Sequence, residues 1–415
     1  MDVDHRTIDR IFREESGRAL ATVARIIGDL DLAEDAVQEA FVIALRVWPE
    51  RGTPAAPGAW ITTTARNRAI DRLRREQRRS AKERSATDPA DRAQTGTHED
   101  EVHPVPDDQL RLMFTCCHPA LSPAAQVALT LRLVSGLTTE EVARAFLTPV
   151  PTIAQRLSRA KAKIRHARIP LRVPPADLLP ERLPGVLACI YLVFTEGYAA
   201  THGDRLIRRE LCNEAIRLTT LVTDLLPNEP EASGLLALLL FQDSRRETRQ
   251  SDTGALVVLE DQDRQRWDHD RIAAGQQRLE QALALSRPGR YQLEAAIAAE
   301  HARATTWEDT DWPTIATLYT ELHRIAPSPV VELNHAVAIS YAQDIAAGLA
   351  LLDTISDDRR LALSHRLPAV RADLLRRAGR QQDAIAAYRE ALTKARSTPE
   401  AQLLHDRLTE LGGSP

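Results

Sequence analysis

Apolar residues recur three and four positions apart along most of this chain, and the alternation typical of strands is lacking. This spacing places apolar side chains on one face of successive helices, so the sequence predicts an all-α fold. Prolines separate the helical stretches, because proline lacks an amide donor and restricts the residue before it. One such break, the run 148–151, lies between helical patterns that begin at Thr139 and near Thr152. These two helices are predicted to form a helix-turn-helix.

The second of these helices is basic on the faces that its apolar residues leave free. Ile153, Leu157 and Ile164 form the apolar stripe, and no acid occurs from Val142 to Arg168. A basic helix after a tight turn is the usual element that enters the major groove of DNA. A solvated positive face is the alternative interpretation, and this helix alone does not separate the two.

A second basic helix is predicted from Trp60 to Arg84, where nine basic residues stand against three acids. Ala65, Ala69 and Leu73 supply a narrow apolar stripe, so the helix can pack on one side and offer guanidinium groups on the other. Guanidinium forks bind phosphate through paired hydrogen bonds. The run before this helix, residues 49–58, is rich in proline and glycine and predicts an irregular loop.

An amphipathic helix from Leu32 to Trp48 precedes that loop and carries acids at its start. Glu34 and Asp35 suit the positive end of the helix dipole. They also suit a face that docks on a partner, and the sequence leaves both interpretations open.

In this order the elements resemble the bacterial extracytoplasmic-function sigma factors of the sigma-70 family, over residues 8 to about 168. The first motif consists of Asp31, Glu34, Asp35, Val37, Gln38, Glu39 and Phe41. The second consists of Trp60, Ala65, Arg66, Asn67, Arg68, Ala69, Ile70, Asp71, Arg74 and Arg75. The third consists of residues 140–143, Thr152, Ile153 and residues 156–161.

The resemblance implies three binding surfaces on this chain. One binds the core RNA polymerase, through the β′ clamp helices and the β subunit, and two bind promoter DNA. The residues implied in polymerase docking are Asp31, Glu34, Asp35, Gln38, Glu39 and Phe41. Those implied in opening the minus-ten element are Trp60, Arg66, Asn67, Arg68, Asp71, Arg74 and Arg75. Those implied at the minus-35 element are Thr152, Gln155, Arg156, Ser158, Arg159 and Lys163.

The chemistry of the individual side chains divides the last group. Gln155 and Arg156 are the best candidates to read base edges, because glutamine pairs with adenine and arginine with guanine. Arg159 and Lys163 fit phosphate contacts, which position a protein without specifying sequence. Trp60 fits either a core anchor or a stacking platform for an unpaired base.

The chain is longer than two such small domains need. We predict a minus-ten domain at residues 1–80, a flexible polar linker at 81–107, a helix-turn-helix domain at 108–170 and an extension at 171–415. Residues 1–170 carry a net charge of about +3 and residues 171–415 about −7. A self-masking or partner-binding extension and an ordinary acidic surface both fit this asymmetry.

The extension reads as helix after helix with a loose internal repeat. Starting at residues 315, 348 and 384, similar residues recur at spacings of 0, 4 and 7, and a weaker copy starts at 215. The intervals of 33 and 36 residues are close to the 34 of a tetratricopeptide repeat. The whole chain resembles the subgroup of these sigma factors that bears such an extension, which implies regulation through the fused extension. The charge asymmetry and the repeat surface lead to the hypothesis that this control is intramolecular, through contact between the extension and the sigma domains.

Few residues suggest chemistry of another kind. Cys116, Cys117 and the nearby His118 favour a buried structural role over metal binding or redox sensing, since no C-x-x-C pair is present and apolar residues surround them. The charged run 252–270 predicts an ordered loop, with a buried helix turn at residues 256–259 or a metal site at its acids as alternatives. Residues 191–204 predict a buried helix followed by a glycine turn, with a polar site at Glu196, His202 and Asp204 as the alternative. We expect no catalytic residues, no cofactor, no metal and no enzymatic activity. Without an apolar run of membrane-spanning length, a cytoplasmic protein is expected.

A different class of function remains open at this point. The protein could be a helix-turn-helix regulator that binds duplex DNA unaided, with the extension as a signal or adaptor platform. The acidic motif around Asp35 and Gln38 separates the two hypotheses, because a simple regulator needs no polymerase-docking face.

Overall fold

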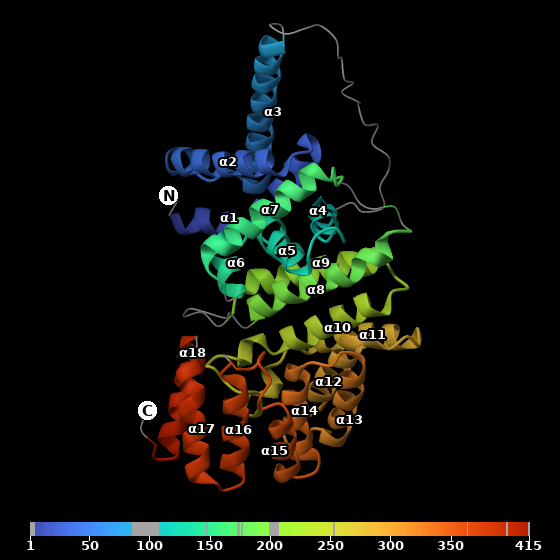
Figure 1. Cartoon of the computed structure of the whole chain (residues 1–415), viewed down its shortest axis with the longest axis vertical. Coiled ribbons are helices and arrows are strands. Elements are labelled where there is room, and N and C mark those ends of the chain that lie inside the picture. The colour runs from blue at the N-terminus through green and yellow to red at the C-terminus, as the bar shows by residue number, and fades with distance from the viewer. Residues whose placement is uncertain are drawn as a thin grey trace. The chain divides into compact units, whose positions relative to one another are not determined.

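The computed structural model describes residues 5–84, 108–146, 148–171, 175, 177–198, 207–251, 254–362, 364–395 and 397–413. These residues form helices and connecting loops, and within these ranges there is no β-strand beyond one isolated bridge (Figure 1). The prediction of an all-α fold is confirmed. The chain divides into two compact units, residues 1–193 and 194–415. This division falls within a helix, some twenty residues beyond the predicted start of the extension.

The first unit contains a three-helix part, a helix-turn-helix part and most of a further long helix. Its elements are α1 (His5–Ile27), α2 (Leu30–Arg51), α3 (Pro57–Arg84), α4 (Asp108–Cys116), α5 (Pro123–Leu129), the π-helical segment η1 (Thr130–Val134), α6 (Thr139–Ala145), α7 (Val150–His166) and α8 (Leu179–Tyr198). The predicted linker 81–107 lies outside the described residues from residue 85 onward, and its first four residues belong to α3.

The loop between α2 and α3 is shorter than the sequence predicted. Helix α2 continues through Pro49 to Arg51, and α3 begins at Pro57, so the irregular part is residues 52–56. Both prolines lie at helix ends, where proline destabilises a helix little. Pro57 is the first residue of α3, where a backbone amide has no partner within the helix. Pro49 lies in the last turn of α2. Gly52 then ends α2 with a positive φ of 81°, which glycine adopts without a steric penalty.

The helix-turn-helix is confirmed, and its local signals explain it. Thr138 and Glu141 form a capping box at the start of α6: each side chain accepts a hydrogen bond from the other's amide, at 3.1 and 2.9 Å. Helix α7 begins at Val150, two residues earlier than predicted, with Pro151 in its first turn. Its predicted apolar stripe is buried against the rest of this part.

The second unit is a succession of packed helices. Its elements are α9 (Arg209–Leu225), α10 (Pro230–Ser244), the short 3-10 turns η2 (Arg246–Thr248), η3 (Leu259–Asp261) and η4 (Arg264–Arg266), then α11 (His269–Ala284), α12 (Arg290–Arg303), α13 (Trp312–Ile325), α14 (Pro329–Ala342), α15 (Ile345–Thr354), α16 (Arg366–Arg377), α17 (Gln381–Lys394) and α18 (Thr398–Glu410). Consecutive helices from α12 to α18 pack on one another (Figure 1).

The positions that repeat in the sequence lie at the contacts between these helices. Ile315, Leu352 and Ala384 are fully buried, as are the residues seven positions after Ile315 and Ala384. Gly348 allows close approach of α14, because a Cβ there would lie 2.7 Å from both the Ala336 carbonyl oxygen and the Ser340 Cβ. The repeat therefore marks small and apolar residues that interlock neighbouring helices.

The described part of the charged run, residues 254–268, is an ordered loop, as predicted, and one buried arginine organises it. The guanidinium of Arg264 donates to the carbonyl oxygens of His301 (2.6 Å) and Ala304 (2.9 Å) and to the Thr310 hydroxyl (3.2 Å). The two carbonyls belong to the end of α12, where helix carbonyls lack partners within the helix. Arg264 thus satisfies the end of a helix some forty residues further along the chain.

Candidate docking and nucleic-acid interfaces

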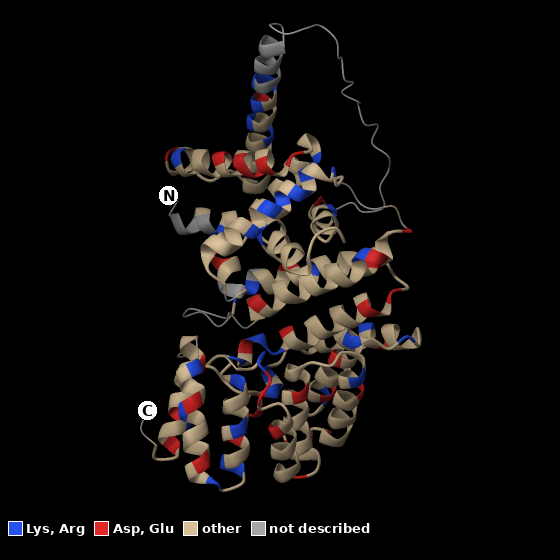
Figure 2. Ribbon diagram, viewed as in Figure 1, with Lys and Arg blue, Asp and Glu red and all other residues tan. Residues whose placement is uncertain are grey.

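Helix α2 presents acids on two sides of its exposed surface. Asp29 caps the helix, and its carboxylate accepts from the amides of residues 31 and 32 at 2.8 and 3.0 Å. The alanine-rich side of α2 is buried, so the acids of the first two turns remain outside. Figure 2 shows acidic residues along α2 and basic residues along α3 and α7.

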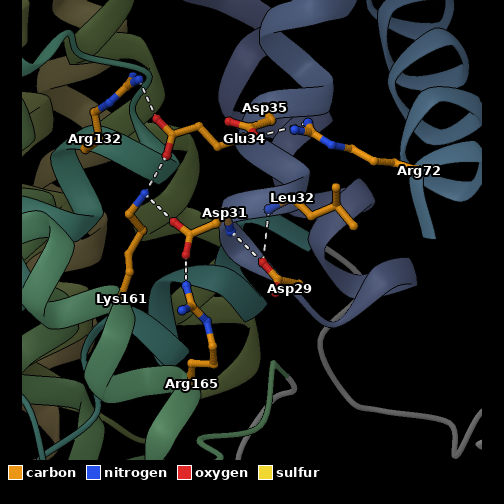
Figure 3. A network of polar contacts seen from close by, with 9 residues as sticks. All are labelled: Asp29, Asp31, Leu32, Glu34, Asp35, Arg72, Arg132, Lys161 and Arg165. Carbon is orange, nitrogen blue, oxygen red and sulfur yellow. Dashed lines mark hydrogen bonds and ion pairs between the residues drawn. The ribbon is translucent and has the colours of Figure 1, made fainter. Parts of the chain in front are cut away.

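Asp31 and Glu34 contact the basic residues of the helix-turn-helix part. The Lys161 ammonium lies 2.7 Å from an Asp31 oxygen and 3.0 Å from a Glu34 oxygen. Arg132 lies 2.5 Å from the other Glu34 oxygen, and Arg165 pairs with Asp31 (Figure 3). The side chains of Glu34, Lys161 and Arg132 are each less than a fifth exposed. We call these five residues the ion-pair cluster.

Asp35 and Glu39 instead face α3, where Arg72 lies 3.1 Å from Asp35 and 3.8 Å from Glu39. All three side chains remain about half exposed. They line an open hollow of ≈450 Å³ together with Gln38 and Arg68. Because these side chains are exposed, their charges are accessible to a partner. Exposed ion pairs of this kind also contribute little to stability, so a partner can replace them at low cost.

Two further residues of α2 extend this accessible face. Val42 is 47% exposed and Leu45 38%, and they lie seven and ten positions after Asp35 on nearly the same side of the helix. Phe41, which the resemblance places among the docking residues, is buried and packs edge-on against Phe12 with ring centroids 4.8 Å apart. Phe41 therefore supports the face from inside, and Val42 and Leu45 are exposed in its place.

Trp60 packs on the core and also keeps part of its ring at the surface. Its ring packs edge-on against the fully buried Trp48 at 5.4 Å, which fixes α3 against α2. It is nevertheless half-buried rather than enclosed. Part of the ring therefore remains available at the start of α3.

The basic surface of α3 is open along the described side chains. Ala65 and Ala69 are fully buried and hold the helix on the core. The predicted minus-ten residues other than Trp60 are all exposed; they are Arg66, Asn67, Arg68, Asp71, Arg74 and Arg75.

The predicted minus-35 residues likewise lie on the outside of α7. Thr152, Gln155, Ser158, Arg159 and Lys163 are exposed, and Arg156 is half-buried. The Arg156 guanidinium lies 5.2 Å from the centre of the Phe146 ring, in the turn before α7. This stacking orients Arg156, one of the two residues predicted to read base edges.

All four cysteines are buried, and Cys189 lies within α8. The Cys117 Sγ is 3.6 Å from the Cys189 Sγ, and burial raises the pKa of the Cys116 thiol well above its usual range. Among the described residues, no group of three or more histidine, cysteine or acidic side chains is arranged to hold a metal ion. Glu196 pairs with Arg208 at 3.5 Å, while His202 and Asp204 lie outside the described residues.

No helix in the described part of the chain has both the length and the apolar character that crossing a membrane requires.

Comparison with known protein families matches three segments. Sigma-70 region 2 matches residues 11–79, which correspond to the three-helix part, and sigma-70 region 4 matches residues 111–164 of the helix-turn-helix part. A family of unknown function (DUF6596) matches residues 182–283, which begin within α8.

The similar proteins fall into two groups. An uncharacterized protein of Rhizobium meliloti is 43% identical over 96% of this chain and 94% of its own length. The probable ECF RNA polymerase sigma factor SigI of Mycobacterium tuberculosis is 26% identical over 42% of this chain and 59% of its length. The ECF RNA polymerase sigma-E factor of Haemophilus influenzae is 27% identical over 40% of this chain and 90% of its length. No solved structure gives a significant match.

A region 2 of three helices followed by a region 4 helix-turn-helix defines a protein of sigma-70 type. The ECF RNA polymerase sigma factor SigK of Mycobacterium ulcerans is 30% identical over 36% of this chain and 79% of its own length. The chain belongs to the extracytoplasmic-function group of the sigma-70 family, and it carries a long helical C-terminal extension.

Proposed function

We propose that the protein binds the core RNA polymerase through α2 and directs it to specific promoters. The observation that carries this proposal is the exposed face of α2, on which Asp35, Gln38, Val42 and Leu45 follow one another beside an open hollow. A strip that joins acids to exposed apolar side chains fits a helical partner with basic and apolar groups. In this family the expected partner is the pair of β′ clamp helices.

Helix α3 is proposed to engage the minus-ten element. Taking a base out of the stack costs a few kcal/mol, which protein contacts must offset. The exposed guanidinium groups of Arg66, Arg68, Arg74 and Arg75 can bind the phosphates of the separated strand. The part of the Trp60 ring that stays exposed offers a face on which a base can stack.

Helix α7 is proposed to read the minus-35 element in the major groove. Its outer stripe carries Gln155, Arg159 and Lys163 at helical spacing, with Arg156 held against Phe146 beside it. Gln155 and Arg156 are the residues that discriminate bases, and Arg159 and Lys163 bind phosphate.

The combined variant Arg159→Ala/Lys163→Ala should weaken promoter binding by the holoenzyme for all minus-35 sequences. Because two phosphate contacts are lost, the slope of log affinity against log salt should fall in magnitude by about 1.8. Fluorescence anisotropy with labelled promoter duplexes at several salt concentrations measures this. Arg10→Ala, an exposed arginine of α1, is the control that should leave the slope unchanged. An unaltered slope in the double variant would place these residues away from the DNA backbone.

The extension is proposed to control the two sigma regions through direct contact. The N-terminal half of α8 supports this, because it packs on region 4: Arg182 donates to the Phe114 carbonyl oxygen at 3.3 Å, and Cys189 contacts Cys117. Gly185 allows this packing, since its position lies against Cys117 and Gln126. Any change in how α8 is held thus bears directly on the helix-turn-helix.

Ending the chain after residue 175 should change transcription from a cognate promoter severalfold and lower the thermal stability of region 4, since Phe114 and Cys117 lose their cover. A chain that ends after Tyr198 retains α8 and separates the two effects. Run-off transcription with core polymerase and thermal unfolding measure them. Full activity in both truncated chains would remove the proposed control.

The proposed function as a whole is tested by reconstitution. The purified chain and sigma-free core polymerase are incubated with fragmented genomic DNA, and the 5′ ends of the transcripts are sequenced. Initiation should occur at gene starts that share two upstream motifs. If the chain retains duplex fragments without polymerase and supports no initiation, it acts as a stand-alone helix-turn-helix regulator instead.

A further inference from the structure

Two cysteines that are far apart in the sequence meet where α8 packs on region 4. Cys117 directly follows α4 in region 4, and Cys189 lies in α8, 72 positions further along the chain. Both are free thiols, their Sγ atoms are 3.6 Å apart, and the residues are only 2% and 1% exposed. A disulfide requires about 2.05 Å between the sulfurs, so an approach of about 1.5 Å would join them.

Contacts on the same side of α8 hold the two backbones in place. Gly185 lies one turn before Cys189, and a Cβ there would already be 3.6 Å from the Cys117 Cβ. Two turns before Cys189, Arg182 donates to the carbonyl oxygen of Phe114 at 3.3 Å. The packing of α8 on region 4 therefore places the two sulfurs next to each other throughout the folded state.

The surroundings make the two thiols unequal. A hydrogen bond from Cys117 lowers the pKa of the Cys189 thiol, and Thr130 acts in the same direction, whereas burial opposes both. The pKa of the Cys117 thiol is raised by the same hydrogen bond and by burial. The thiolate is the reactive form of cysteine. Cys189 is therefore the sulfur that attacks an oxidant, and Cys117 is the neighbour that can resolve the product.

The adjacent cysteine is a natural comparison for this pair. Cys116 is fully buried in α4, and burial and the nearby Cys189 both raise the pKa of its thiol well above the usual range. A thiol in such a site stays neutral and unreactive. Cys116 therefore serves as the control for Cys117, at the same depth and in the next position of the chain.

The reaction of such a pair with hydrogen peroxide needs no other reactant. The Cys189 thiolate attacks one peroxide oxygen, the O–O bond breaks, and a sulfenic acid forms on Cys189. The hydroxide that leaves takes up the proton that Cys189 had released. The Cys117 sulfur then attacks the Cys189 sulfur, the S–O bond breaks, and the hydroxyl leaves with the Cys117 proton as water. Two thiols are oxidised to one disulfide, and one peroxide is reduced to two waters.

Burial decides how the reaction is reached and how long its product lasts. Because both residues are covered, peroxide reaches them only when the contact between α8 and region 4 opens briefly. The same cover shields a disulfide from reductants once it has formed. The bond would span 72 positions that include the helix-turn-helix, and it would remove the freedom of α8 to leave region 4.

We propose that Cys117 and Cys189 form a disulfide on exposure to peroxide, and that this bond changes the activity of region 4 by fixing α8 on it. The effect on transcription rests on the proposed control by the extension, whereas the formation of the bond depends only on the geometry of the pair. In the reduced chain α8 is held by packing and hydrogen bonds alone.

Peptide mapping of the full chain tests the bond. The reduced protein is treated with hydrogen peroxide, free thiols are blocked with N-ethylmaleimide, and tryptic peptides are analysed by mass spectrometry without reduction. A cross-link between Cys117 and Cys189 should appear in the native chain and in Cys116→Ala, and dithiothreitol should remove it. Cys117→Ala and Cys189→Ala should lack it.

Two results would overturn the bond. One is a folded native chain that stays unlinked in excess peroxide and also with diamide, a reagent that joins neighbouring thiols directly. The other is a cross-link that persists in Cys117→Ala, which would assign it to Cys116. Fragmentation of the cross-linked native peptides locates the bond between adjacent cysteines, so the result stands even where a variant fails to fold.

Run-off transcription from a cognate promoter tests the consequence, with peroxide removed before core polymerase is added. The oxidised native chain should differ severalfold from the reduced chain, dithiothreitol should reverse the change, and Cys189→Ala should be insensitive to peroxide. Equal activity of the reduced and the fully cross-linked chain would overturn the regulatory role. If the reduced chain initiates at no promoter, the proposed function is wrong, and peptide mapping still decides whether the bond forms.

Discussion

Replacing Asp35 and Gln38 together by alanine should weaken binding of the protein to core polymerase by about 30-fold or more. Central interface residues that are buried on binding each contribute a large share of the affinity, and the loss of about 2 kcal/mol corresponds to this factor. Both side chains line the open hollow beside α3, and neither belongs to the ion-pair cluster. Titration of labelled core polymerase with the full chain gives the dissociation constants.

The intramolecular partner of Asp35 provides the matched control for this result. Arg72→Gln breaks the same ion pair but leaves the carboxylate in place, so it should not weaken docking. Glu14→Ala removes an exposed acid of α1 and controls for net charge. Equal affinity of the native chain and Asp35→Ala/Gln38→Ala would show that polymerase binds another surface. A matching loss in Arg72→Gln would show that the variant acts through the packing of α3.

Replacing Arg264 by alanine should lower the free energy of unfolding of the C-terminal unit by about 2–4 kcal/mol. The charged guanidinium donates to three acceptors, and a hydrogen bond to a charged group has a net worth of about 1.5–3 kcal/mol. Water reaches these acceptors once the side chain is truncated, so the expected loss is smaller than the sum of three such bonds. Its removal leaves the carbonyls of His301 and Ala304 without this donor and uncovers the faces of Trp267 and Trp307. Urea unfolding followed by tryptophan fluorescence measures the change.

The neighbouring arginine separates this effect from a simple change of charge. Arg266 belongs to the same short turn but is exposed, so Arg266→Ala should change stability by no more than about 0.5 kcal/mol. Arg264→Lys keeps the charge, yet an ammonium cannot reach three acceptors in a fork, and it should restore less than half of the loss. If Arg264→Ala is no less stable than Arg266→Ala, the loop does not hold the end of α12.

The sequence predicted several elements correctly because their signals are local. The apolar stripe of α7 and the exposed arginines of α3 follow from residue spacing within one helix. The loop between α2 and α3 was predicted too long because composition was taken as decisive, whereas Pro49 and Pro57 occupy helix ends where proline is tolerated. Phe41 was grouped with the docking residues by motif, although its position on the inner side of α2 buries it.

The roles of individual charges were beyond the reach of the sequence. From the sequence, Lys161 and Arg165 are simply members of one basic helix. Nothing in their spacing shows that their partners differ from those of Arg159 and Lys163. Arg264 read as one more charge in a solvated loop. In each case the partner is distant in the chain, so its identity depends on which helices pack together.

The sequence by itself determined the helical fold, the order of the two sigma regions and the surfaces that face outward, because helical periodicity and capping depend on residues within a few turns of one another. Only the tertiary structure decided that Asp31 and Glu34 pair with region 4 while Asp35 remains open beside α3. The physical reason is that an ion pair needs two atoms within about 4 Å, and residues 127 positions apart, such as Lys161 and Glu34, come that close only through packing that no local pattern encodes.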